Sequence, residues 1–233
     1  MRRAAALHGW RVLALSPWRI AVRDDADTRR RLRAALAADI LVVTSPAAVR
    51  AAASLAPLRS RRGQRWCAVG AATAAALRRA GIADARSPER MDSEGLLALP
   101  LLLDVCGRRV GLLTAPGGRD RIAPELRERG AEVLRADVYA REPVPPTPVA
   151  LARLRAHAGS LLLPVSSGEA LLTAIAAVPA DIAARLREAR VLAASARLAE
   201  LAREAGFRDV RIAGGPRPAQ LLAAAETSPH GSE

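Results

Sequence analysis

The sequence predicts an α/β protein of two lobes, each a flavodoxin- or Rossmann-like parallel sheet covered by helices. Short apolar runs of strand length alternate with Ala-rich stretches that carry apolar residues at helical spacing. Strands that alternate with helices in this way form parallel sheets with helices on both faces. The order of strand, turn and helix also occurs twice along the chain, and such self-similarity predicts two lobes of one pattern.

The chain opens with a predicted helix that ends near Gly9, and a strand is predicted to follow it directly. The same helix-to-strand pattern returns at Gly130, where the strand runs on to Tyr139. In that second copy a strand and a Gly-rich turn, VGLLTAPGG, precede the helix. We therefore expect the first copy to lack its leading strand and turn in front of Met1.

Two strand-turn-helix units match each other next. Residues 40–43 form a predicted buried strand, and Ser45 follows it in a small polar turn before an Ala-rich helix. Residues 161–165 are the matching strand, and Ser167 holds the place of Ser45. Serine at the start of a helix accepts a hydrogen bond from a free N–H group, so capping and ligand contact are both open for these residues.

The following unit of each copy is a strand that runs into a small residue, and then a helix that ends at a glycine. In RWCAVGAATAAALRRAGI the strand runs into Gly70 and the helix ends at Gly81. In RVLAASARLAELAREAGF the strand runs into Ser195 and the helix ends at Gly206. Glycine suits the left-handed position just past a helix, so both stretches are predicted as strand-helix units.

Two segments rich in charged residues or in proline separate the lobes. RIAVRDDAD is charged, and the prolines of AREPVPPTPVA keep that segment extended and exclude a helix. One lobe is therefore expected to be discontinuous and to take both ends of the chain. The predicted domains are a discontinuous α/β lobe of residues 1–20 and 148–226, an inserted α/β lobe of residues 27–139, linkers at residues 21–26 and 140–147, and a tail at residues 227–233.

The net charge of +13 comes from 36 basic residues, all of them arginine. A charge of this size is typical of proteins that bind nucleic acids, but an acidic small molecule fits it equally well. Aromatic residues make up only 2% of the chain, which leaves few rings for stacking bases. Nucleic-acid binding therefore stays an alternative that salt-dependent retention on DNA would reveal.

The remaining composition indicates a cytoplasmic protein without membrane contact or metal. There is no run of about 18 uncharged apolar residues and no signal-peptide pattern. Cys67 and Cys106 are too few for a disulfide framework or a zinc site, and both are expected as small buried core residues. His8, His157 and His230 are far apart, so no metal site or histidine-based triad is predicted. Dinucleotide, P-loop and GxSxG motifs are also missing.

A ligand is expected at the strand-to-helix turns. In open α/β sheets ligands bind beyond the carboxyl ends of the strands, where helix N-termini attract anions. Small side chains let an anion approach the backbone, and hydroxyl groups add hydrogen-bond donors. The turns of this composition are Thr44–Ser45, Gly70–Thr73, Pro116–Gly118, Ser166–Gly168 and Ala194–Ser195. Together they favour a large polyanionic ligand, although capping explains any one of them.

Two further residues are candidates by position. Ser93 precedes an apolar helix and is predicted to cap it, so capping and ligand contact are both open. Tyr139 is the only tyrosine and stands where the chain leaves its lobe. Its hydroxyl could face a ligand, or its ring could pack between the lobes.

The order and spacing of several stretches resemble the uroporphyrinogen-III synthase family. The stretches are LVVTSPAAVRA, AVGAATAAALRRAGI, SEGLLAL, GRRVGLLTAPGGRDRIAPELRERGAEVLRADVYARE and VLAASARLAELAREAGF, and the resemblance runs from the first residues to about Ala225. It implies two α/β lobes, one discontinuous, with a two-stranded connection and an active site between them. It also implies a cofactor-independent lyase that converts the octa-carboxylate hydroxymethylbilane into uroporphyrinogen III, with loss of water and inversion of ring D.

The resemblance also implies roles for residues. Thr73 of VGAAT and Tyr139 of VYARE match catalytic positions, where the tyrosine would help the substrate hydroxyl leave to give an azafulvene that closes through a spiro intermediate. The expected substrate-binding residues are Ser45, Gly70, Ser93, Gly117, Gly118, Ser167 and Ser195. No metal is expected, and much of the rate is expected from folding the substrate into a reactive shape. The expected partners are the substrate and the upstream hydroxymethylbilane synthase, with the chain acting as a monomer.

The sequence departs from the family pattern in two places. The Thr-Arg-Pro-like turn after a first strand is absent, and Ala194–Ala196 stands where many relatives carry a Gly-Pro-Thr-Thr-like turn. The alternative to an enzyme is a non-catalytic two-lobed paralogue that binds anions or regulates. Such a paralogue would bind the substrate without converting it.

Overall fold

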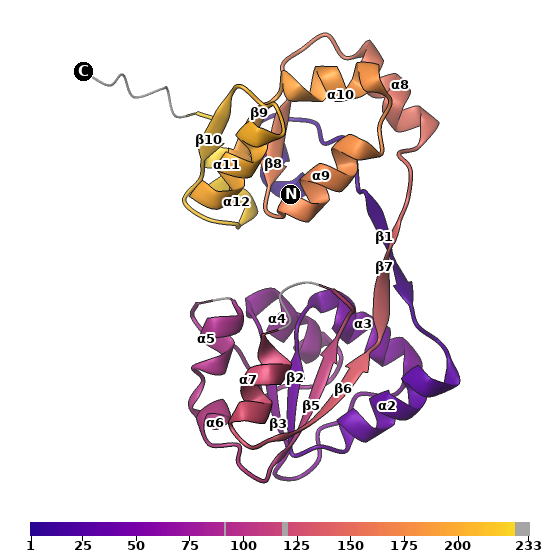
Figure 1. Cartoon of the computed structure of the whole chain (residues 1–233), viewed down its shortest axis with the longest axis vertical. Helices are drawn as coiled ribbons and strands as arrows, with labels where there is room; N and C mark the ends of the chain where they lie inside the picture. Colours follow the sequence, from indigo (N-terminus) through magenta and orange to yellow (C-terminus); the bar gives the residue numbers. More distant parts are fainter. Residues whose placement is uncertain (91, 118–120, 227–233) are drawn as a thin grey trace, which may run out of the picture. The chain divides into compact units, whose positions relative to one another are not determined.

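The computed structural model describes residues 1–90, 92–117 and 121–226. The chain divides into two compact units. Residues 20–142 form the inserted unit, and residues 1–19 together with the chain from Pro143 onward form the split unit. Figure 1 shows the indigo start of the chain in the same body as its orange and yellow part, although the whole inserted unit separates them in sequence.

The inserted unit is built on a parallel sheet of five strands in the order β4-β3-β2-β5-β6. Alternate residues of a strand face opposite sides of a sheet. Leu41 and Val43 accordingly belong to one apolar cluster, and Ile40 and Val42 belong to another. Burial on both faces explains why this strand is an uninterrupted apolar run. The strands are β2 (Ile40–Val43), β3 (Arg65–Ala68), β4 (Ala85–Arg86), β5 (Arg109–Thr114) and β6 (Glu132–Asp137).

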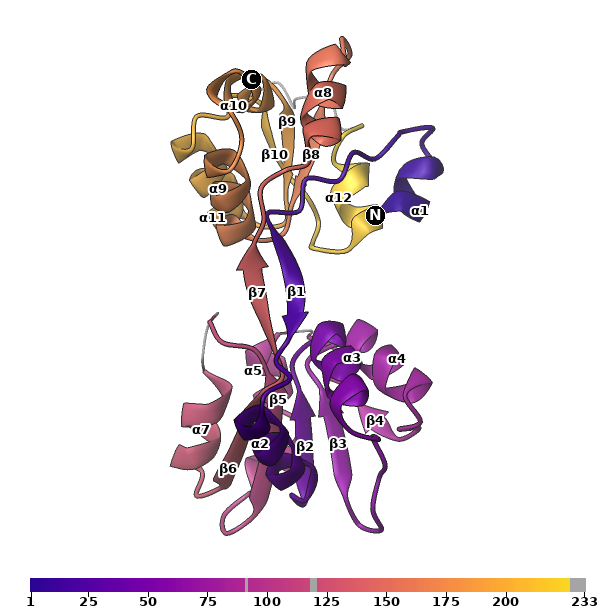
Figure 2. The ribbon, with the colours of Figure 1, turned by 90° about the vertical axis from the view of Figure 1, so that its right-hand side faces the viewer.

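Helices cover both faces of this sheet, as Figure 2 shows. They are α2 (Ala26–Leu36), α3 (Pro46–Leu55), α4 (Ala71–Arg79), α5 (Ser93–Leu97), α6 (Pro100–Leu103) and α7 (Ile122–Glu128). The first three pack in the cluster of Leu41, and the last three pack in the cluster of Val42. Gly111 in β5 lies so close to α2 that a Cβ atom there would collide with the carbonyl oxygen of Ala35.

The split unit has, among its described residues, a parallel sheet of three strands in the order β10-β9-β8. Its strands are β8 (Leu162–Val165), β9 (Arg190–Ala193) and β10 (Val210–Ile212), and its helices are α1 (Arg2–Ala6), α8 (Pro148–Ala156), α9 (Gly168–Ala176), α10 (Ala180–Arg187), α11 (Ala196–Glu204) and α12 (Pro218–Ala223). Helices α9 and α11 pack with Val191, whereas α1 and α12 pack with its neighbour Leu192 on the other face. Parallel sheets in both units confirm the predicted fold class. No helix in the described part of the chain has the length and apolar character needed to cross a membrane.

The strand predicted directly after the opening helix is not formed. Residues 10–15 are irregular, and the first strand, β1 (Trp18–Val22), begins only later. The corresponding strand of the inserted unit, β6, pairs with β5. No strand among the described residues of the split unit pairs with residues 10–15, so this backbone has no ladder to join. Side chains hold the segment instead, because Val12 and Leu13 pack on separate apolar clusters.

A two-stranded sheet links the units along the chain. It pairs β1 with β7 (Tyr139–Pro143), and the two arrows run in opposite directions in Figure 2. Just past this sheet, the N–H group of Val144 donates to the carbonyl oxygen of Pro17 at 3.0 Å. The proline-rich segment is extended through β7, as its prolines predict, but its last residues are not, because Pro148 begins α8, where proline is tolerated in the first turn of a helix.

The strand predicted to run through Tyr139 breaks at Val138. The preceding strand, β6, ends one residue before it, and β7 begins one residue after it. Val138 donates its N–H group to the carbonyl oxygen of Thr114 at 3.0 Å and accepts the N–H group of Arg23 at 3.1 Å. The chain changes its partner from β5 to β1 at this residue, and Tyr139 follows directly.

The two cysteines differ in environment. Cys67 lies buried in β3, and burial raises the pKa of its thiol to about 12. Cys106 is exposed, so its prediction as a buried core residue is wrong. It precedes Gly107, which has a φ of 68°, in the turn that leads into β5. Both thiols are free.

Candidate active site

A cavity of about 310 Å³ lies in the inserted unit, where β2 and β5 end. The carboxyl ends of parallel strands meet at one edge of a sheet, so side chains from separate turns converge there. Residues from β6, β7 and the starts of α5 and α7 complete the wall. The lining residues are Thr44, Ser45, Val69, Ser93, Leu112, Thr114, Ala115, Pro116, Gly117, Ile122, Arg135, Tyr139 and Arg141.

The turn between β2 and α3 supplies two hydroxyl groups to this cavity. The Oγ atom of Ser45 accepts the N–H group of Ala48 at 3.0 Å, which confirms that this serine caps the helix. Thr44 donates its hydroxyl to Oγ1 of Thr114 at 2.9 Å. This bond ties the end of β2 to the end of β5, and both threonines line the cavity.

Tyr139 reaches the cavity from the first position of β7. The residue is 3% exposed, and its ring packs in the same apolar cluster as Val43, Ala48 and Val138. The phenol oxygen lies 3.0 Å from Oγ of Ser45, within hydrogen-bond distance. The hydroxyl of Tyr139 therefore lies at this cavity beside Ser45, while its ring packs in the core of the inserted unit.

Two arginines that were not among the predicted site residues also line the cavity. Arg135 of β6 donates Nε to Oδ1 of Asp137 at 3.0 Å and another nitrogen to the carbonyl oxygen of Ala115 at 3.4 Å. Arg141 lies two residues after Tyr139, and alternate residues of a strand face the same side. That alternation was a usable signal for Arg141. Arg135 could be found only through the pairing of β6 with β5.

Ser93 and Gly117 also line the cavity, but the cap of α5 is not the predicted one. Asp92 is the capping residue, because its carboxylate accepts the N–H group of Gly95 at 2.8 Å, and Ser93 is the first residue inside the helix. Burial raises the pKa of the Asp92 carboxyl, but hydrogen bonds from Gly95 and from Arg90 outweigh burial and hold it below its usual value.

The other expected site residues lie elsewhere or outside the described chain. Gly70 caps α4 with extended backbone, and Thr73 is buried in the first turn of that helix; neither lines the cavity. Ser167 and Ser195 belong to the split unit, where they cap α9 and α11 by accepting N–H groups at 3.3 Å and 3.4 Å. Gly118 lies outside the described residues.

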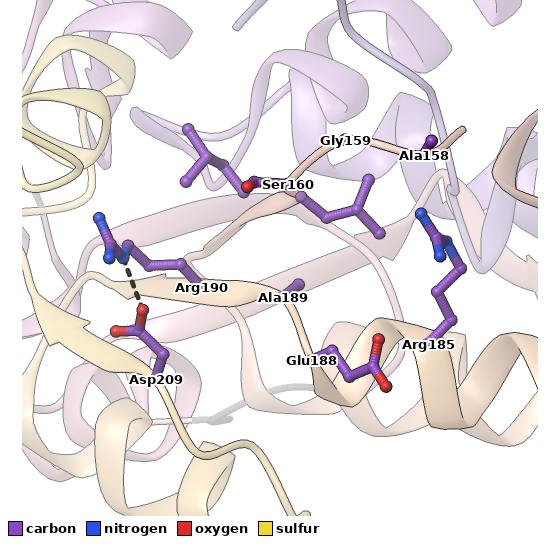
Figure 3. A pocket seen from close by; sticks show the side chains of 10 residues that line it. Ala158, Gly159, Ser160, Arg185, Glu188, Ala189, Arg190 and Asp209 are labelled. Atoms are coloured by element: carbon purple, nitrogen blue, oxygen red, sulfur yellow. Dashed lines mark hydrogen bonds and ion pairs between the residues drawn. The ribbon is translucent and has the colours of Figure 1, made fainter.

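A second cavity, of about 360 Å³, lies in the split unit at the starts of β8 and β9 (Figure 3). Arg190 donates Nε to Oδ2 of Asp209 at 2.7 Å on one side of it, and Arg185 and Glu188 stand on the other. It contains none of the predicted site residues. Because ligands of such sheets bind at the opposite, carboxyl ends of the strands, we do not assign the site here.

The fold and the site together define a two-domain α/β protein with a polar, arginine-bearing cavity at the edge of a parallel sheet. No group of three or more His, Cys, Asp or Glu side chains is placed to hold a metal ion in residues 1–90, 92–117 and 121–226. The family model described as uroporphyrinogen-III synthase HemD matches residues 1–223. The chain belongs to this family.

Two curated relatives are named uroporphyrinogen-III synthase. The chain is 38% identical to that of Salmonella typhimurium over 152 residues, which cover 64% of this chain and 61% of the relative. It is 34% identical to that of Escherichia coli over 181 residues, which cover 75% of this chain and 73% of the relative. The matched part thus spans less than two thirds of the Salmonella protein.

Solved structures agree on the fold. A uroporphyrinogen-III synthetase of Helicobacter pylori has a TM-score of 0.64 at 15% identity, with 94% of this chain and 95% of that chain covered. A mutant uroporphyrinogen III synthase of Thermus thermophilus has a TM-score of 0.58 at 20% identity, with 97% of this chain and 92% of that chain covered. At these identities the likeness establishes the architecture alone.

Proposed function

We propose that this chain converts hydroxymethylbilane into uroporphyrinogen III, as a lyase that needs no cofactor. The observation that carries the proposal is the hydroxyl pair of Ser45 and Tyr139 in a cavity that two arginines also line. A linear tetrapyrrole with many carboxylates needs cationic anchors and a proton donor at its reacting end. Family membership supports the same reading.

Arg135 and Arg141 are the proposed anchors for the acetate and propionate carboxylates. A guanidinium-carboxylate pair forms charge-assisted hydrogen bonds, which are stronger than neutral ones. The ten-residue helix α3 adds the partial positive charge of its N-terminus beside Ser45. A cavity of about 310 Å³ is too small for the whole substrate, so it would hold the hydroxymethyl-bearing end.

Substrate-binding roles for the remaining expected residues belong to the same proposal. Ser93 and Gly117 would let carboxylates approach the wall of the cavity. The other contacts would come from Gly70, Gly118, Ser167 and Ser195, with Thr73 in a catalytic role at the start of α4. Gly70, Ser167 and Ser195 stand at helix starts, where small residues let an anion approach the backbone N–H groups.

Tyr139 is the proposed proton donor. As the C–O bond of the hydroxymethyl group breaks, its electron pair leaves with the oxygen, which takes a proton and departs as water. The nitrogen lone pair of the ring stabilises the azafulvene-type cation that remains. Attack by the substituted carbon of ring D gives the spiro intermediate, whose rearrangement inverts that ring. Loss of one ring proton restores the aromatic pyrrole, so one water is lost overall.

The test is to add the chain to freshly made hydroxymethylbilane and to separate the oxidised porphyrin isomers. Spontaneous closure gives the type I isomer, and only inversion of ring D gives type III. We expect type III in excess over a reaction without protein. Type I alone, from a chain shown to be folded, would contradict the proposal. Saturable binding of the substrate without turnover would then favour the non-catalytic paralogue, which no observation on the described residues supports at present.

The setting of the reaction follows from the same proposal. The chain would act as a monomer in the cytoplasm, on substrate released by hydroxymethylbilane synthase. Hydroxymethylbilane closes spontaneously, so a nearby source of fresh substrate would limit the type I by-product. Gel filtration of the chain, alone and with that synthase, checks both the monomer and the partnership.

A further inference from the structure

Ser45 has two hydrogen-bond partners at the cavity. One donates to its hydroxyl oxygen, and the other can either donate or accept. Its Oγ atom accepts the N–H group of Ala48 at 3.0 Å and lies 3.0 Å from the phenol oxygen of Tyr139. A serine hydroxyl has one hydrogen and two lone pairs. The cap uses a lone pair, so the serine can still either donate to the phenol or accept from it.

The direction of this bond decides what the phenol can do. If Tyr139 donates to Ser45, its only hydrogen is committed to the protein. If Ser45 donates to Tyr139, the phenol hydrogen is free to meet a ligand. A hydroxyl that already accepts a hydrogen bond is polarised and becomes a better donor. Ser45 accepts such a bond from a backbone N–H at the positive end of α3, so donation by the serine is the favoured direction.

The packing around Tyr139 limits both the position of its ring and the partners of its hydroxyl. Its ring is held in the apolar cluster with Val43, Ala48 and Val138, and the residue is 3% exposed. Among the described residues, Ser45 is the partner found for its hydroxyl. The core therefore fixes the position of the ring, and the only partner found for the phenol among the described residues is Ser45.

We propose that Ser45 is a positioning residue that acts through Tyr139. It donates to the phenol oxygen and thereby directs the phenol hydrogen to the leaving hydroxyl of the substrate, an inference that rests on the proposed function. The chain of bonds runs from the N–H group of Ala48 through Ser45 and Tyr139 to the ligand. When the leaving oxygen takes the phenol proton, the hydrogen bond from Ser45 stabilises the phenolate. Tyr139 regains a proton when the closing macrocycle releases one, so no further reactant is needed.

The kinetic test uses Ser45→Ala, which removes the donor, and Ser45→Thr, which keeps it. We expect Ser45→Ala to lower kcat about tenfold with KM changed less than about twofold, the size of one lost hydrogen bond. We expect Ser45→Thr to restore most of kcat. In a Tyr139→Phe background Ser45→Ala should have no further effect on kcat. Equal losses in both backgrounds, or a rise in KM alone, would show that Ser45 contacts the substrate directly and would overturn the proposal.

A matched control separates positioning from capping. Thr147 caps α8 in the split unit by accepting the N–H group of Ala150 at 3.2 Å, and it has no place in the proposed site. Thr147→Ala and Ser45→Ala should both lower the unfolding midpoint, and Ser45→Ala should lower it more, because it also leaves the buried phenol of Tyr139 without its partner. Only Ser45→Ala should lower kcat. If both variants lost kcat to a similar extent, the loss at Ser45 would come from a less stable helix and not from the position of Tyr139.

A spectroscopic test needs no activity, because Tyr139 is the only tyrosine of the chain. The Raman doublet of a tyrosine ring distinguishes a phenol that accepts a hydrogen bond from one that only donates. We expect an accepting phenol in the wild-type chain and in Ser45→Thr, and loss of that character in Ser45→Ala. A donor-only phenol in the wild type would overturn the proposal. A chain that shows the accepting phenol but forms no type III isomer would refute the proposed function and leave the hydrogen-bond direction established.

Discussion

The proposed reaction depends on one hydroxyl group, that of Tyr139, which lies at the cavity. The change Tyr139→Phe removes that group and keeps the ring, which packs in the apolar cluster of the inserted unit. We expect kcat for type III formation to fall on the order of 100-fold without reaching zero, because substrate folding supplies part of the rate. A complete loss of activity with an unchanged circular dichroism spectrum would contradict this account, and so would an unchanged rate.

Arg141 should act through its charge. We expect Arg141→Ala to raise KM about tenfold and to leave kcat nearly unchanged, because a lost charge-assisted hydrogen bond weakens binding of a carboxylate. The difference from the wild type should shrink at high ionic strength, since salt screens exposed charges. Steady-state kinetics at two salt concentrations measure both effects.

Arg50 provides the matched control for Arg141. It is an exposed arginine on α3 that does not line the cavity. Arg50→Ala removes the same charge from the same unit and should leave KM within about twofold of the wild type. If both changes raised KM equally, the net charge of the chain, rather than the cavity, would account for binding.

The two thiols should react at different rates. Burial raises the pKa of Cys67 to about 12, so in the folded chain this thiol stays protonated and unreactive at pH 8, whereas Cys106 is exposed. We expect one thiol to react with a thiol reagent in the native state and the second only on unfolding. Because the folded pKa is raised, stability from Cys67 is complete below the ordinary thiol pKa and is lost as pH rises toward 12. Rapid labelling of both thiols without denaturant would contradict the buried position of β3.

At the scale of elements, helix α2 approaches strand β5 closely at Gly111, and a substitution there tests this packing. We expect Gly111→Ala to destabilise the inserted unit by about 1–3 kcal/mol or more, because the new Cβ would collide with the carbonyl oxygen of Ala35. Gly214→Ala is the control, since a Cβ there meets no atom within 4 Å. Chemical denaturation measures both, and a similar free energy of unfolding for the two variants would contradict the close approach.

The sequence predicts an element correctly where residues close together in the chain carry the whole signal for it. The run at residues 40–43 is apolar on both faces and became β2, and Ser45 caps the next helix as expected. Residues 10–15 have a similar apolar pattern but formed no strand, because a strand needs a partner that composition cannot reveal. Asp92 and Ser93 are both suitable caps, and only the backbone geometry of the turn selects Asp92.

At the scale of the whole molecule, the repeat predicted two parallel-sheet units, and the structure has both. The candidate site was predicted in part, since Ser45, Ser93, Gly117 and Tyr139 do surround one cavity. Arg135 joins them through strand pairing between residues distant in sequence. The chain has 36 arginines, and the residues around Arg135 carry no signal that distinguishes it from the others.

The most direct test of the central claim is the initial rate of each porphyrin isomer at increasing concentrations of the chain. The account predicts that type III formation rises in proportion to the protein and that type I formation falls as substrate is diverted. Parallel reactions with Tyr139→Phe should show the same trend with a smaller slope. A type III rate that does not depend on the amount of folded wild-type chain would contradict the claim that this cavity closes the tetrapyrrole.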